Sequence, residues 1–291
     1  MPDDAAAQRA AAEEESAFSH PHVAPDATAA YGEHPDQVID FYVPRGGETV
    51  APLVVTLHGG AWRTPYDRGH LTPFADFLAR RGFAVANVEY RRGATDPAPD
   101  DSGPVAGRWP DTFDDIAAAL DALPALAREA LPQADLRRTV LTGHSAGGHL
   151  ALWAAARHVL PPDAPWRTSG PAALRGVVAL APIADLAMAE KLEVCGHAAL
   201  QLLGGGDEFT DRQRYADPAL LLPTGIATTL VQGRTDDVVP QAVAESYADA
   251  SAKAGEVVGL TLLEDVGHFP LIDPAADACA VVAEEIAQLA W

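Results

Sequence analysis

Residues 143–147, with the sequence GHSAG, place a serine between small residues where a strand would turn into a helix. The preceding segment 139–143 is short and rich in β-branched residues, which predicts a strand, and residues 146–159 have the composition of a helix. A sharp turn between the two leaves room only for small neighbours, which the motif provides. We therefore predict that Ser145 is a nucleophile at the edge of a sheet, rather than a serine in a structural turn.

A serine hydroxyl needs a general base at neutral pH, and histidine is the residue that most often serves. Of the ten histidines, His268 stands apart, because its segment EDVGHFP (264–270) follows the last predicted strand and precedes the last predicted helix. The carboxyl ends of parallel strands meet at one edge of a sheet, so this loop should lie beside Ser145. We predict that His268 is the base. His144, the residue before Ser145, should point away from the serine hydroxyl.

A carboxylate is also needed to orient the base. The segment VQGRTDDVVP (231–240) follows another predicted strand and offers Asp236 and Asp237. We favour Asp236 as the orienting acid and expect Asp237 to cap the next turn.

The segment HGGAW (58–62) directly follows a further predicted strand. Two adjacent glycines let a backbone approach a ligand closely and direct its N–H groups toward it. We predict that Gly59, Gly60 and the N–H of Ala146 form an oxyanion hole. His58 is expected to hold this loop in place.

Trp62 and His144 are the candidates for contact with the substrate. Trp62 follows the glycines directly and would close one side of the acyl pocket, leaving room for formyl or acetyl groups. Packing on the sheet edge is the alternative interpretation for this tryptophan.

The elements that must position these residues alternate along the chain. QVIDFYV (37–43) alternates apolar and polar residues and predicts an edge strand. Strand patterns at 53–57, 83–88, 139–143, 175–182, 227–233 and 258–264 alternate with helix patterns at 70–81, 111–123, 146–159, 241–255 and 273–290. This alternation predicts an α/β fold with a mostly parallel sheet and helices on both faces.

The domain organisation is expected to be simple. Residues 1–30 predict a flexible N-terminal arm, with a loose helix and an irregular segment, and residues 31–291 predict one domain. A Pro-, Asp- and Gly-rich loop is expected over 93–110, and a short cap-like insertion over 183–222.

Together these motifs resemble those of the α/β-hydrolase superfamily, and within it the HGG-type esterases. The resemblance covers roughly residues 37–290 and rests on HGGAW, GHSAG, GRTDDVVP and VGHFP in that order. It implies a serine, aspartate and histidine triad and an acyl-enzyme, without a cofactor. Gln232 stands where many relatives have histidine, and we expect no mechanistic cost, because that position lies outside the triad.

Two subgroups share further motifs with the chain. HGGAW and the preceding YGEHPDQVIDFYVP (31–44) are similar to kynurenine formamidases, the arylformamidases. HGGAWR, YRR (90–92) and RWPDTFDDI (108–116) are similar to small bacterial esterases of the feruloyl and acetylxylan type. The implied function is hydrolysis of small carboxylic esters, with hydrolysis of N-formylkynurenine as the alternative.

Other functions fit the sequence less well. A non-catalytic binding protein of the same fold usually lacks a triad residue, and all three are present here. A peptidase on this fold would be expected to carry a large additional N-terminal domain. No histidine and aspartate cluster has the spacing of metal ligands.

Composition argues against several classes of partner. The chain has 41 acidic and 20 basic residues and a formal net charge of -21, which repels nucleic acid and anionic lipid. Cys195 and Cys279 form neither a disulfide framework nor a zinc motif. The acidic N-terminus does not resemble a signal peptide and no window suits a membrane span, so we expect a cytoplasmic protein. The oligomeric state stays open.

Overall fold

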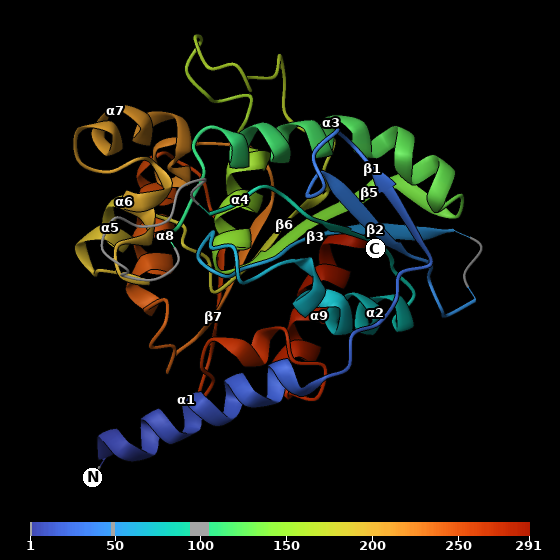
Figure 1. Ribbon diagram of the computed structural model, residues 1–291, viewed down its shortest axis with the longest axis horizontal. Helices are drawn as coiled ribbons and strands as arrows, with labels where there is room; N and C mark the ends of the chain where they lie inside the picture. The colour runs from blue at the N-terminus through green and yellow to red at the C-terminus, as the bar shows by residue number, and fades with distance from the viewer. Residues whose placement is uncertain (1, 48–49, 94–104) are drawn as a thin grey trace.

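The computed structural model describes residues 2–47, 50–93 and 105–291 (Figure 1). Within them lies an eight-stranded sheet with the order β1-β2-β4-β3-β5-β6-β7-β8. The strands are β1 (Ala27–Ala30), β2 (Val38–Tyr42), β3 (Ala51–Leu57), β4 (Ala84–Val88), β5 (Ala134–His144), β6 (Gly176–Leu180), β7 (Thr228–Gly233) and β8 (Gly259–Leu263). The β1–β2 and β2–β4 pairs are antiparallel and the other pairs are parallel, which confirms the predicted α/β class.

The strand β2 is not the edge strand that its alternating sequence predicts. β1 pairs along its outer side, and Ala27 lies opposite Phe41. The polar residue that creates the alternation, Asp40, is buried and accepts hydrogen bonds from Arg68 Nε at 2.6 Å and Thr28 Oγ1 at 2.6 Å. The alternating pattern suggested that Asp40 faces solvent, but its carboxylate pairs with Arg68 inside the protein.

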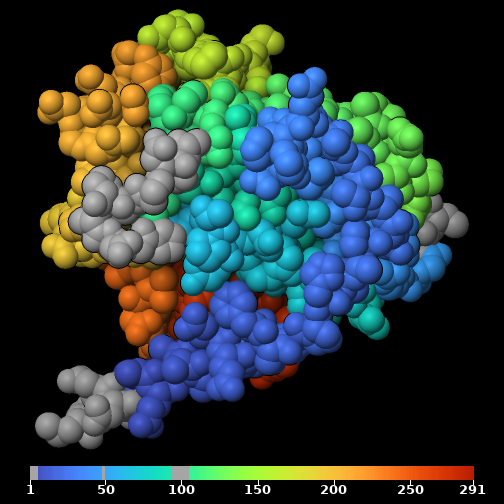
Figure 2. Space-filling view, viewed as in Figure 1, coloured from blue at the N-terminus to red at the C-terminus, as the bar shows by residue number. Residues whose placement is uncertain are grey.

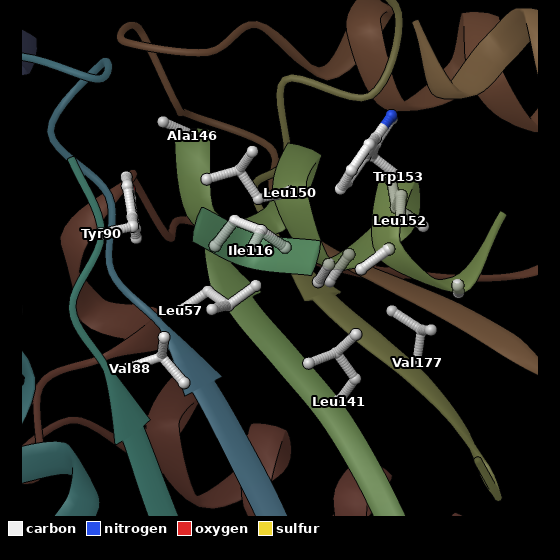
Figure 3. Packing of buried hydrophobic residues seen from close by; sticks show 14 of the residues in the cluster. Leu57, Val88, Tyr90, Ile116, Leu141, Ala146, Leu150, Leu152, Trp153 and Val177 are labelled. Carbon is white, nitrogen blue, oxygen red and sulfur yellow. The ribbon is translucent and has the colours of Figure 1, made fainter. Parts of the chain in front are cut away.

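Helices cover both faces of the sheet. One face carries α2 (Thr72–Arg80) and α9 (Asp277–Ala290), and the other carries α3 (Asp111–Ala130), α4 (Ala146–Ala155) and α8 (Gln241–Lys253). In Figure 3, Leu57, Leu141 and Val177 point from three neighbouring strands toward Ile116 of α3 and Leu150 of α4. Burial of each such side chain contributes about 1.5–3 kcal/mol, so this packing fixes the strand ends that carry the site.

The insertion between β6 and β7 is helical. It contains α5 (Leu186–Lys191), α6 (Ala198–Leu202), α7 (Gly206–Ala216) and the 3₁₀ helix η2 (Pro218–Leu220), coloured yellow to orange in Figure 1. Most of the Pro-, Asp- and Gly-rich loop expected over 93–110 lies outside the described residues, which omit 94–104.

The N-terminal segment is part of the folded molecule. Residues Pro2–Ser19 form helix α1, which packs against the 3₁₀ helix η3 (Phe269–Leu271) directly after His268. In Figure 2, α1 (blue) lies against the red C-terminal segment along the lower side of the molecule. Because β1 also joins the sheet, the domain begins before the predicted boundary at residue 31.

Candidate active site

Ser145 lies at the turn between β5 and α4, as the sequence predicts. Its backbone has φ 57° and ψ −118°, a conformation that costs a non-glycine residue about 1–3 kcal/mol. The turn is so tight that a Cβ at Gly143 would overlap the carbonyl oxygen of Gly147, and one at Gly147 would overlap that of Leu57. Close packing of the two glycines therefore maintains the strained serine.

His268 and Asp236 are in direct contact. His268 Nδ1 lies 2.7 Å from Asp236 Oδ2, and both side chains are buried. The other carboxylate oxygen accepts the backbone N–H groups of Val238 at 2.9 Å and Val239 at 2.8 Å. The neighbouring Asp237 is exposed, and Asp236, the aspartate that the sequence favours, is the one in contact with His268.

Gln232 also contacts the acid. Its Nε2 donates to Asp236 Oδ2 at 3.1 Å and to the carbonyl oxygen of Val239 at 3.1 Å. The residue that departs from the family pattern therefore helps to orient the carboxylate, which its place outside the triad did not suggest.

Ser145 and His268 line the same cavity, which has a volume of about 120 Å³. Within the described residues, the Ser145 hydroxyl has no hydrogen-bond partner. His70, from the 3₁₀ helix η1 (Arg68–Leu71), and Phe18, from α1, also line the cavity. Neither residue lies in a motif, so no functional role was predicted for them.

His70 presents a neutral imidazole to the cavity. Burial, followed by the nearby His58, lowers the pKa of His70 to about 3. Its Nδ1 is buried and has no hydrogen-bond partner among the described residues. An uncharged ring here suits a small neutral substrate better than an anionic one.

The segment 58–62 borders the cavity through Gly60 and Ala61, whereas Gly59 does not line it. A Cβ at Gly59 would lie 3.0 Å from the carbonyl oxygen of His144, so that glycine packs against the serine turn instead. Ala146 is the first residue of α4, where backbone N–H groups have no partner within the helix. Gly60 and Ala61 thus border the cavity, whereas Gly59 and Ala146 do not line it, and the predicted oxyanion hole of Gly59, Gly60 and Ala146 stays a prediction.

A buried network holds this segment. His58 Nδ1 lies 2.9 Å from the carbonyl oxygen of Gly59, and its Nε2 lies 2.8 Å from Glu89 Oε1. The ring stacks on Tyr90 with centroids 4.2 Å apart. Burial alone would raise the pKa of Glu89. His58, Arg92 and a backbone hydrogen bond outweigh burial, so that the pKa is lowered to about 2. His58 thus has the structural environment expected of it.

His144 and Trp62 have different surroundings. His144 lines the cavity, and its Nε2 lies 3.0 Å from the carbonyl oxygen of His268. Burial lowers the pKa of His144 well below its usual value, so the neutral ring donates to that carbonyl. Trp62 is fully buried, packs edge-on against His149 and does not line the cavity. The structure places Trp62 in packing, the alternative that the sequence left open.

The BD-FAE family profile matches residues 39–250, which include Ser145 and Asp236. The chain belongs to this family. The matched part ends before His268. In this BD-FAE protein, the position of that histidine beside Asp236 is therefore known from the structure and not from the family match.

Several curated relatives of this BD-FAE protein are named as hydrolases. A kynurenine formamidase-like hydrolase of Fusarium equiseti is 26% identical over 249 residues, 77% of this chain and 79% of the relative. A probable isoprenylcysteine alpha-carbonyl methylesterase of Oryza sativa subsp. japonica is 25% identical over 272 residues, 89% of this chain and 61% of the relative. This chain thus spans less than two thirds of that second relative.

The fold is shared with solved esterases. Esterase B from Lactobacillus rhamnosis superposes with a TM-score of 0.74 at 20% identity, over 99% of this chain and 92% of that chain. The BD-FAE protein therefore has the α/β-hydrolase fold. Its family and its named relatives show that it is a hydrolase. Among the described residues, no helix has the length and apolar character that a membrane span requires.

Proposed function

We propose that this protein is a serine hydrolase that cleaves small carboxylic esters with the triad Ser145, His268 and Asp236. The observation that carries the proposal is the 2.7 Å contact between His268 Nδ1 and Asp236 Oδ2, in a cavity that Ser145 also lines. This contact leaves the second ring nitrogen of His268 available for proton transfer, the arrangement that activates a serine.

The proposed reaction has two acyl-transfer steps. Ser145 Oγ attacks the ester carbonyl while His268 takes its proton, and Asp236 stabilises the imidazolium that forms. The N–H groups of Gly59, Gly60 and Ala146 stabilise the oxyanion, and each such donor is worth about 3 kcal/mol. His268 then protonates the departing alcohol. In the second step His268 takes a proton from water, which attacks the acyl-enzyme and releases the acid and Ser145.

The cavity supports a small substrate. Its volume is about 120 Å³. Pockets for drug-sized ligands measure about 300–1,000 Å³. Formyl and acetyl groups fit this space, whereas a long acyl chain would require displacement of a wall.

Hydrolysis of N-formylkynurenine is the second candidate. Two relatives support it, the Fusarium equiseti hydrolase and the kynurenine formamidase of Danio rerio, which is 22% identical over 254 residues. Phe18, Tyr66 and Phe269 give the cavity an aromatic lining, which suits an aryl leaving group.

The two candidates are separated by kcat/KM for p-nitrophenyl acetate and for N-formylkynurenine, measured on one preparation. We expect the ester to be preferred; a strong preference for the formamide would establish the second candidate. Ser145→Ala should reduce either activity at least about 10³-fold, because it removes the nucleophile. Ser251→Ala, a serine buried in α8, is the matched control and should retain activity. If Ser145→Ala keeps turnover within a few-fold of the wild type, the mechanism is wrong.

A further inference from the structure

The N-terminal helix α1 contributes a side chain to the proposed active site. Phe18, in the last turn of α1, lines the cavity that contains Ser145 and His268. Its ring lies 5.6 Å from that of His70 and 6.5 Å from that of Tyr66, between centroids. The ring is 39% exposed, so one side borders solvent while the other faces the cavity.

Contacts on both sides of His268 hold α1 in this position. Glu13 lies so close to Gly267 that a Cβ there would overlap its carboxylate. Beyond the histidine, Asp273 accepts a hydrogen bond from Ser16 Oγ at 2.6 Å, and its other oxygen lies 2.6 Å from His20 Nε2. The Asp273 side chain is 5% exposed, which shields these contacts from water. Phe18 is therefore fixed relative to the catalytic loop.

Phe18 lies on the histidine side of the serine. Its ring contacts Phe269 at 5.4 Å in an edge-on arrangement, and Phe269 contacts His268 at 5.1 Å. The leaving group must lie on this side, because His268 donates its proton to the departing oxygen.

Building on the proposed ester hydrolysis, we propose that Phe18 is a specificity-determining residue that limits the size of the alcohol portion of the substrate. The Phe18 ring forms a wall beyond the leaving oxygen, and the contacts of α1 with Gly267 and Asp273 prevent that wall from moving aside. On this proposal, the acyl group occupies the part of the cavity on the other side of Ser145, away from the ring.

The test compares the hydrolysis of ethyl, butyl and hexyl acetate by the full-length protein. Phe18→Ala should raise the ratio of kcat/KM for hexyl acetate to that for ethyl acetate, by about fourfold for each methylene newly buried. Phe18→Trp should lower the same ratio. Each variant is compared with the wild type on the same ester, which cancels differences in intrinsic reactivity.

Three controls define the result. Phe209→Ala removes a phenylalanine of α7 that does not line the cavity, and should leave the ratio unchanged. A series of p-nitrophenyl acetate, butyrate and hexanoate varies only the acyl group, so its ratios should stay within twofold in the Phe18 variants. Ser16→Ala combined with His20→Ala releases α1 from Asp273 and should shift the alkyl series in the same direction as Phe18→Ala.

The outcomes separate this inference from the proposed function. If the alkyl acetate ratio stays within twofold in both Phe18→Ala and Phe18→Trp, the wall does not select substrates. If the acyl series responds instead, the assignment to the leaving-group side is wrong. Both results require that the wild type hydrolyses p-nitrophenyl acetate and that this activity depends on Ser145. A wild-type protein without this activity would overturn the proposed function itself.

Discussion

The residues around the cavity come from two different parts of the fold. Ser145, Asp236 and His268 each follow a strand whose carboxyl end reaches one edge of the sheet, so pattern and topology were enough to bring them together. Phe18 and His70 reach the same cavity from an N-terminal helix and a 3₁₀ turn. No strand period predicts such contacts, because they depend on how separate elements dock.

The two adjacent aspartates give a sharp test at the residue scale. Asp236→Asn should lower kcat by about 10⁴-fold, because an amide opposite His268 Nδ1 favours the wrong imidazole tautomer. Asp237→Asn changes the exposed neighbour and should stay within twofold of the wild type. The measurement is kcat for p-nitrophenyl acetate at saturation. Equal losses in both variants would contradict the assignment of Asp236.

At the scale of elements, the strands were predictable and the docked segments were not. Continuous apolar runs mark β3 and β4 because both faces of these strands are covered. β1, with the sequence ATAA, has no such pattern, and it is defined by its pairing with β2. α3 extends past Pro124 to Ala130, beyond the predicted end at residue 123, and Ala127 in this extension is buried.

The buried network of His58 and Glu89 that holds residues 58–62 leads to a prediction about stability. Glu89→Ala would leave the buried His58 and Arg92 without their carboxylate, and should cost about 3–5 kcal/mol of unfolding free energy. Glu89→Gln keeps an acceptor and should cost less. Urea denaturation of both variants checks the order. An equal cost for the two would show that shape, rather than charge, matters there.

The junction of α7 and η2 should respond to pH. Burial raises the pKa of Asp217 to about 6, although Gln213 opposes the shift. The folded state therefore keeps its proton at pH values where the unfolded chain, whose aspartate has the ordinary pKa of 3.8, has lost it. Stability from this group is complete below that value and is lost as pH rises toward 6, a change of about 3 kcal/mol.

Asp217→Asn removes this titration. The unfolding free energy of the variant, relative to the wild type, should rise by about 2 kcal/mol between pH 4 and pH 7, measured in urea. Asp211→Asn, an exposed position on the same helix, is the matched control. A difference that stays constant across this pH range would rule out the buried proton.

The whole molecule carries a formal net charge of -21, and like charges oppose the compact state. The Debye length shortens from about 30 Å at 0.01 M salt to about 8 Å at 0.15 M. Sodium chloride should therefore raise the midpoint of thermal unfolding over this range at pH 7.5, as followed by circular dichroism. A falling midpoint would mean that screened ion pairs outweigh the general repulsion.

The contact between Ser16 and Asp273 joins residues 257 positions apart. Contacts that close such long loops form late and slowly during folding, after local helices and neighbouring strands. The strands that carry Ser145, Asp236 and His268 can therefore pair before α1 docks. Until α1 docks, the cavity that Ser145 and His268 line lacks the side chain of Phe18.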